Sequence, residues 1–146
     1  VIKSNENRSK LLLQRVYKIL DNKVKKKNIS FLGVTFKANT DDMRDSSSLT
    51  MIPELSKKGA LIRYYDPTGF KKDFKKYKNV QFVKSIDRCL AKADLIIIHT
   101  EWNDFKSLNF KRLLKNNKTI IFDMRNLYSP NKMNKKNIKY FSVGRS

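Results

Sequence analysis

The chain has 146 residues, enough for one domain with a buried core and too few for a two-domain enzyme. Its 33 lysines and arginines against 13 acidic residues give a net charge of +20, which makes nucleic acid a partner to consider. The lysines are spread over the whole chain, however, and no basic run alternates with aromatic residues as a base-stacking surface requires. Binding of nucleic acid is therefore the weaker interpretation.

A single cysteine excludes a disulfide framework, and no apolar run approaches the roughly 18 residues of a membrane-spanning helix. No signal peptide is recognised either. These features predict a soluble, cytoplasmic protein that does not associate with membranes.

The predicted elements alternate between helices and strands along the chain. An amphipathic helix over 4–20 and a polar linker over 21–28 precede a strand over 29–34, and a helix then runs from the three serines 46–48 to near Gly59. The later elements are strands over 61–65, 80–83, 95–99, 119–122 and 138–143, helices over 85–92 and 110–115, a helical face of Phe70, Phe74 and Tyr77, and a turn at 128–131. The order predicts an α/β fold: a Rossmann-like, doubly wound and mostly parallel sheet of five or six strands, preceded by an N-terminal helix.

The most informative stretch follows the first strand, where Gly33 stands alone and no G-x-G-x-x-G is present. A pyrophosphate could not approach the backbone closely past the side chains that follow Gly33, so ordinary dinucleotide binding is not expected here. Ser46, Ser47 and Ser48 are candidate N-caps for the next helix.

Polar and aromatic side chains follow three of the predicted strands. In a parallel sheet the strand ends at 34, 99 and 122 open on one edge, where ligands bind. The guanidinium groups of arginines, with a lysine beside an aromatic ring, suit a ligand with phosphates and a flat base. Arg44 could equally form ion pairs with the aspartates around it. The residues gathered at this edge are Phe36, Lys37, Arg44, His99, Glu101, Trp102, Asp123 and Arg125.

Three further residues have a simple structural interpretation. Cys89 is expected to pack in a helix, His99 to be structural, and Trp102 to be a lid or packing residue rather than a stacking platform. No cysteine–histidine pair, serine triad or metal-ligand cluster is found, so neither catalytic nor metal-binding residues are predicted.

In order and spacing, five motifs resemble the C-terminal domain of the UDP-glucose 6-dehydrogenase and GDP-mannose dehydrogenase family. They are GVTFKANTDDMRDSSSLTMIPEL, RYYDP, ADLIIIHTEWNDF, IFDMRNLY and YFSVGR, and they cover nearly the whole chain. Residues 1–28 resemble the end of the helix that joins the two domains of that family and forms its dimer core, but they depart from its usual pattern, in which glutamine and a basic residue follow the asparagine. Residues 29–146 then correspond to the UDP-sugar-binding domain.

The resemblance implies one half of an NAD-dependent UDP-glucose 6-dehydrogenase, which converts UDP-glucose to UDP-glucuronate in two hydride transfers. Phe36, Lys37 and Arg125 would contact the UDP-sugar, and Arg44 would contact NAD from across a cleft. An N-terminal domain absent from this chain would bind most of the cofactor and would be the main partner, within a homodimer. This half is expected to be inactive alone; the alternative is a stand-alone nucleotide-binding or dimerisation fragment without catalysis.

Overall fold

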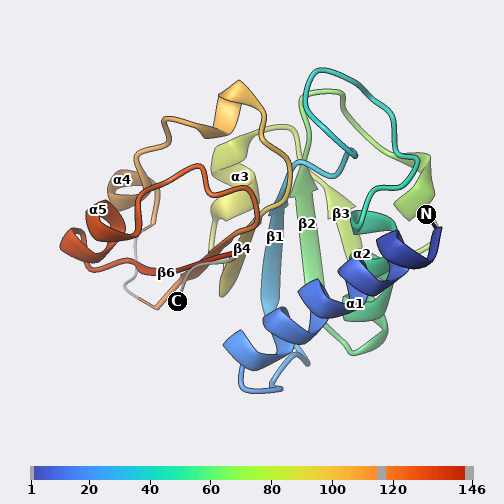
Figure 1. Cartoon of the computed structure of the whole chain (residues 1–146), viewed down its shortest axis with the longest axis horizontal. Helices are drawn as coiled ribbons and strands as arrows, with labels where there is room; N and C mark the ends of the chain where they lie inside the picture. The colour runs from blue at the N-terminus through green and yellow to red at the C-terminus, as the bar shows by residue number, and fades with distance from the viewer. Residues whose placement is uncertain (1, 115–117, 144–146) are drawn as a thin grey trace.

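The computed structural model of the chain describes residues 2–114 and 118–143, with side chains from residue 6 onward. The helices are α1 (Ile2–Ile19), α2 (Ser48–Lys57), α3 (Ile86–Leu90), α4 (Phe110–Leu113) and α5 (Pro130–Lys135). The strands are β1 (Asn28–Leu32), β2 (Leu61–Tyr65), β3 (Val80–Phe82), β4 (Leu95–Ile98), β5 (Ile120–Asp123) and β6 (Lys139–Ser142) (Figure 1). Two 3-10 turns, η1 (Lys72–Phe74) and η2 (Asn103–Phe105), complete the described elements.

The strands form one six-stranded sheet in the order β3-β2-β1-β4-β5-β6, and every described pairing is parallel. The predicted Rossmann-like sheet is therefore confirmed. All four residues of β4 are buried, as expected for the most apolar run of the sequence, because helices cover both faces of its sheet. The strand order reverses between β1 and β4, and a doubly wound sheet binds its ligands beside such a reversal.

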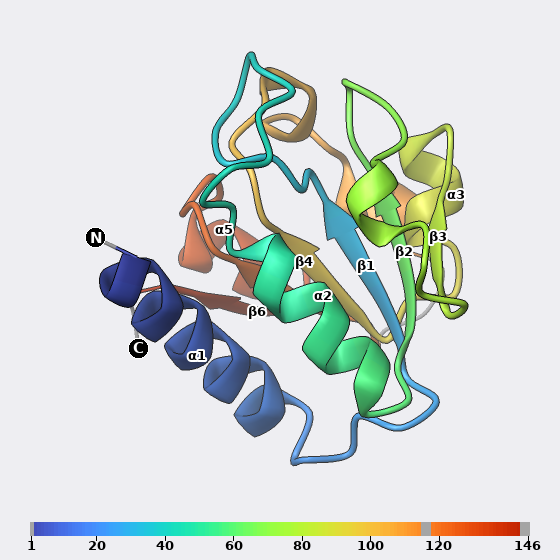
Figure 2. The same ribbon diagram turned by 90° about the vertical axis from the view of Figure 1, so that its right-hand side faces the viewer.

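Helices cover both faces of the sheet (Figure 2). On one face, apolar side chains of α1 and α2, among them Leu12, Val16 and Ile52, form a core with Phe31 of β1. The other face packs against α3, α4 and α5 through a second cluster that includes Leu90, Phe110 and Met133. Helix α1 is thus part of this domain's own core, and its role as an interdomain and dimerisation helix stays a prediction.

Two predictions for local structure are wrong. Only the three residues of η1 are helical in the stretch predicted to carry an aromatic helical face, and Phe70 is 55% exposed while Phe74 is buried. Phe74 packs edge-on against Tyr64 with ring centroids 5.3 Å apart, so tertiary packing replaces helical periodicity. The predicted turn at 128–131 instead begins helix α5, whose N-cap Ser129 accepts a hydrogen bond from the backbone N–H of Lys132.

The described residues contain neither a membrane-spanning helix nor a cluster of metal-ligand side chains. None of the described helices is both long enough and apolar enough to cross a membrane. Within the same residues, no group of three or more histidine, cysteine, aspartate or glutamate side chains is arranged to hold a metal ion.

Candidate functional site

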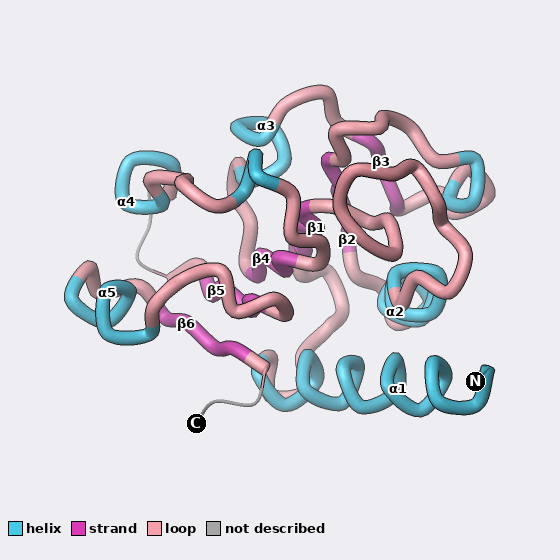
Figure 3. The backbone as a smooth tube through the Cα atoms, turned by 45° about the horizontal axis from the view of Figure 1, so that its top comes forward, coloured by secondary structure: helices cyan, strands magenta, loops and turns pink. Residues whose placement is uncertain are grey.

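The loop that joins β1 to α2, residues 33–47, lies at the carboxyl edge of the sheet, which Figure 3 views from above. We call residues 33–36 with 46–47 the loop base and residues 41–45 the loop tip. Gly33 has φ +79°, and a Cβ atom there would lie 2.6 Å from Cβ of Thr100 and 3.2 Å from the ring of Phe105. The lone glycine therefore allows two loops of this chain to cross closely.

The loop base is closed by hydrogen bonds to Val34. Its carbonyl oxygen accepts from the hydroxyls of Ser46 and Ser48, each at 2.6 Å, and its N–H donates to Oδ2 of Asp66 at 2.9 Å. The prediction that the serines cap α2 through their side chains is wrong, because Ser47 stands at the N-cap with a helical backbone and no capping hydrogen bond. The serine hydroxyls close the loop instead.

His99, fully buried at the end of β4, joins this loop base through both ring nitrogens. Nε2 lies 2.8 Å from Oγ of Ser47, and Nδ1 lies 2.9 Å from Oγ1 of Thr100. Thr100 donates its only proton to the carbonyl oxygen of Thr35, so Nδ1 is the protonated nitrogen and Nε2 accepts from Ser47. Burial, reinforced by the charges of Arg125 and Arg8, lowers the pKa of His99 to about 3.

Arg125, in the loop after β5, is anchored by main-chain atoms. Its Nε donates to the carbonyl oxygen of His99 at 2.9 Å and its Nη2 donates to that of Phe36 at 3.1 Å. Among the described residues these bonds use two of the five N–H groups of the guanidinium, and three are left for a ligand. Burial and the nearby positive charge of Arg8 lower the pKa of Arg125, while Glu101 opposes that shift.

Phe36 and Lys37 lie beside this arginine. The Phe36 ring is 44% exposed, although its carbonyl oxygen is bonded to Arg125. Thr35 donates its hydroxyl to the carbonyl oxygen of Lys37 at 2.9 Å and so fixes the backbone from which the exposed lysine side chain extends. The structure thus brings together Phe36, Lys37 and Arg125, the three residues predicted to bind the UDP-sugar.

Arg44 lies apart from this group, at the loop tip. Its Nε and Nη2 both donate to the carboxylate of Asp42 at 3.0 Å, and its side chain is 88% exposed. The hydrogen bonds from Arg44 lower the pKa of Asp42 below its usual value. The ion pair considered from the sequence is therefore present. Arg44 also lines a hollow of about 640 Å3, together with Asp41, Met43, Thr68, Phe70 and Lys71, that does not include the three predicted UDP-sugar ligands.

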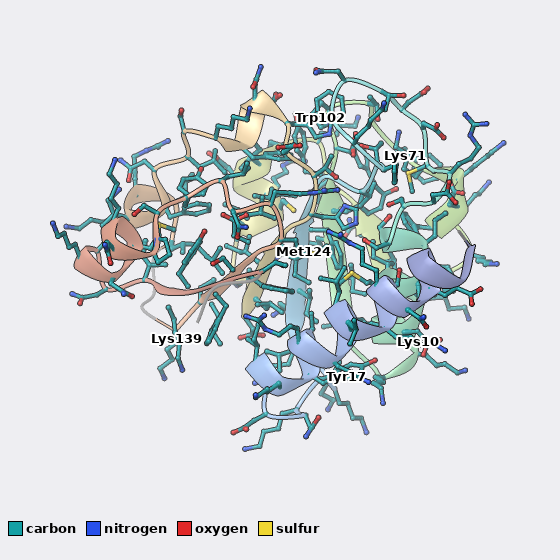
Figure 4. All side chains as sticks on the ribbon, in the orientation of Figure 1. Lys10, Tyr17, Lys71, Trp102, Met124 and Lys139 are labelled. Atoms are coloured by element: carbon teal, nitrogen blue, oxygen red, sulfur yellow. The ribbon has the colours of Figure 1, made fainter. Side chains whose placement is uncertain are left out.

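Trp102 and Cys89 are buried, as their packing roles predict. Trp102, labelled in Figure 4 at the same edge of the sheet, is 8% exposed, and its indole N–H has no hydrogen-bond partner among the described residues. Cys89 lies in the core between α3 and the sheet, where burial raises its pKa to about 12. A thiol held protonated in the core is a poor nucleophile.

Sequence reasoning missed three contributors to the site. Arg8 of α1 acts electrostatically on both His99 and Arg125, although it precedes the sheet by a full helix and a linker. Asp66, the second, fixes the loop base. The third is the role of Asp123, a residue predicted at this edge: it accepts from the backbone N–H of Arg125 at 3.0 Å and from the hydroxyl of Tyr140 at 2.6 Å. The position of Asp66 directly after β2 was the available signal for its role, because that strand ends at the same edge.

Comparison with known proteins identifies relatives along almost the whole chain. Residues 30–130 match the family model described as the UDP-glucose/GDP-mannose dehydrogenase family, UDP binding domain. The chain is 35% identical over 147 residues to a UDP-glucose 6-dehydrogenase of Rickettsia bellii, covering 99% of this chain and 34% of that protein. It is likewise 35% identical over 142 residues to the UDP-glucose 6-dehydrogenase of Rhizobium meliloti, with 97% and 32% covered.

Solved structures share the fold. A UDP-glucose dehydrogenase from Pyrobaculum islandicum superposes with a TM-score of 0.77 at 23% identity, over 99% of this chain and 31% of that one. An NDP-N-acetyl-D-galactosaminuronic acid dehydrogenase from Methanosarcina mazei gives a TM-score of 0.76 at 21% identity, over 96% and 29%. This chain spans about a third of the length of the curated relatives above. From the match of its residues 30–130, the chain belongs to the UDP-glucose/GDP-mannose dehydrogenase family and corresponds to the UDP-binding domain of that family.

Proposed function

We propose that this chain binds a UDP-sugar as part of an NAD-dependent UDP-glucose 6-dehydrogenase. The observation that carries the proposal is Arg125, which is held by two carbonyl oxygens and keeps three N–H groups for a ligand beside Phe36 and Lys37. The guanidinium of Arg125 and the ammonium of Lys37 suit the diphosphate or sugar oxygens. The half-exposed Phe36 offers an apolar surface. The names of the curated relatives favour UDP-glucose among nucleotide sugars.

In this proposal the chain supplies binding and orientation rather than the reacting groups. Cys89 is buried and protonated, so the thiol that would attack the sugar must come from elsewhere in the enzyme. The whole enzyme would convert UDP-glucose to UDP-glucuronate, in the cytoplasm and as a homodimer, with this chain's main partner being the NAD-binding domain.

The residues of this chain fit only a peripheral contact with NAD. The turn after β1 cannot cradle a pyrophosphate, because the space beside Gly33 is filled by Thr100 and Phe105. Arg44, exposed at the loop tip beside the hollow of about 640 Å3, suits a contact to a cofactor held mainly by the other domain. Bound there, NAD would accept the hydride from the sugar.

Isothermal titration of the chain with UDP and UDP-glucose tests the proposal. We expect saturable binding that Arg125→Ala weakens about 10- to 100-fold, because charge-assisted hydrogen bonds contribute roughly 1.5–3 kcal/mol. Arg112→Ala, which removes an exposed arginine of α4, is the matched control and should leave the affinity unchanged. A folded chain that gives no heat at millimolar UDP would overturn the proposal, and stronger binding of GDP would redirect it to another branch of the family.

The net charge of +20 favours one alternative, binding of nucleic acid. Such binding should be tight at low salt and fall steeply as the salt concentration rises. Retention of duplex DNA that saturates and competes with UDP would support this alternative, whereas weak and non-saturating retention would exclude it.

A further inference from the structure

His99 is connected to Arg125 and to both ends of the loop base. Its main-chain carbonyl oxygen accepts from Nε of Arg125, while its ring bonds to Ser47 at the end of the loop base. Through Thr100 the ring also reaches the carbonyl oxygen of Thr35, at the start of the same loop. The main chain of residue 99 therefore anchors Arg125, and the imidazole joins the two ends of the loop that carries Phe36 and Lys37.

The hydrogen bonds of this network run in one direction. Thr100 donates its proton to Thr35, so Nδ1–H donates to Thr100, and in the neutral ring Nε2 accepts from Ser47. Burial, and then the positive charges of Arg125 and Arg8, disfavour protonation of the ring and lower its pKa. The Phe31 ring packs 6.1 Å away, centroid to centroid, on the apolar side. The ring is therefore held neutral and in one tautomer.

We propose that His99 is a positioning residue for the UDP-sugar: its imidazole holds the loop base against the Arg125 anchored by its main chain, in the arrangement that lets Phe36, Lys37 and Arg125 contact one ligand. The inference rests on the proposed function, because it assigns His99 a role in that same site. It goes beyond a structural role in the core, because it predicts a loss of affinity that is independent of any loss of stability.

The chemistry of the network supplies graded variants. Asn at position 99 can keep the donor to Thr100 and lose the acceptor for Ser47, whereas Gln can keep the acceptor for Ser47 and lose the donor to Thr100. Leu removes both and leaves two hydroxyls without their partner. Ser47→Ala is the mildest change, because it removes a single donor. Met133→Ala, in the core on the face covered by α5, is a control that loses stability without touching this network.

The experiment is titration of each folded variant with UDP at neutral pH, alongside its Tm. We expect His99→Leu to raise Kd about tenfold, which corresponds to roughly 1.4 kcal/mol. His99→Asn, His99→Gln and Ser47→Ala should raise Kd by smaller factors, and Met133→Ala should lower Tm with no change in Kd. Rescue of affinity by the Asn or Gln variant relative to Leu separates positioning from packing.

The possible outcomes differ in what they overturn. Affinities that fall only in step with Tm, in Met133→Ala as much as in His99→Leu, would overturn the positioning role and leave the proposed function standing. Absence of UDP binding by the unmodified folded chain would overturn both. If His99→Leu does not fold, the Asn, Gln and Ser47→Ala variants decide the question: unchanged Kd in all three would overturn the proposal.

Discussion

The base and the tip of the loop at 33–47 are built in different ways, although they are adjacent in sequence. The base is largely buried, apart from Phe36, and is bonded to residues far along the chain: Val34 to Asp66, Ser47 to His99, and Phe36 to Arg125. The tip is exposed and bonded within itself, through the pair of Asp42 and Arg44 two residues apart. Long-range bonds fix a side chain relative to the sheet, whereas a local ion pair moves with its own loop.

The two arginines of the candidate site illustrate the difference. Arg125 is held to the main-chain oxygens of His99, directly after β4, and of Phe36 in the loop base, so its position follows from the fold itself. Arg44 is 88% exposed and its partner is also on the surface, and such pairs contribute little to stability. A residue held like Arg125 suits a defined ligand geometry, and one held like Arg44 suits a contact that forms when another surface arrives.

The largest effect is expected from Gly33→Ala, which disrupts the loop base. The new Cβ would overlap Thr100 and the backbone would keep an unfavourable positive φ, so we expect a loss of about 3 kcal/mol in the free energy of unfolding. Gly69→Ala is the control, because Gly69 has φ +91° but open space around its Cβ position. Urea denaturation of both variants measures the difference, and equal losses would show that backbone strain alone explains Gly33.

As the pH falls, the loop base, which contains the bonds to His99, should lose stability at a higher pH than the loop tip. The pKa of His99 falls from 6.5 to about 3 on folding, so the unfolded chain takes up a proton first and stability falls as pH drops below 6.5. Between pH 7 and pH 5 the expected loss is about 2 kcal/mol. His99 is the only histidine in the sequence, so His99→Gln should remove this loss. If His99→Gln unfolds in urea with the same pH dependence as the unmodified chain, the loss of stability does not come from His99.

The smallest effect is expected from Arg44→Ala, which breaks the ion pair of the tip. Both partners are exposed to solvent that screens them, so Tm should stay within experimental error and the affinity for UDP should not change. Calorimetry and titration with UDP check the two statements. A fall in UDP affinity as large as that in Arg125→Ala would remove the distinction between base and tip.

The sequence was sufficient to predict the sheet and the edge of the sheet at which the polar residues gather. Apolar runs such as that of β4 predicted the strands, and the helix predicted to begin at 85 is α3, capped by Ser85, because these signals are local. It was insufficient for the serines at the start of α2: the hydroxyls of Ser46 and Ser48 bond to Val34 and that of Ser47 bonds to His99, rather than capping the helix. It also missed Arg8, because only the packing of α1 across the sheet brings that charge to His99 and Arg125.

The buried thiol of Cys89 can be used to measure how often the domain opens. It is the only cysteine in the sequence, and it lies against the carbonyl oxygen of Phe31 at 3.5 Å, out of reach of solvent. A thiol-specific reagent can therefore react only when α3 separates from the sheet or the whole domain opens. The rate of labelling would report that opening in each variant, without a probe introduced into the core.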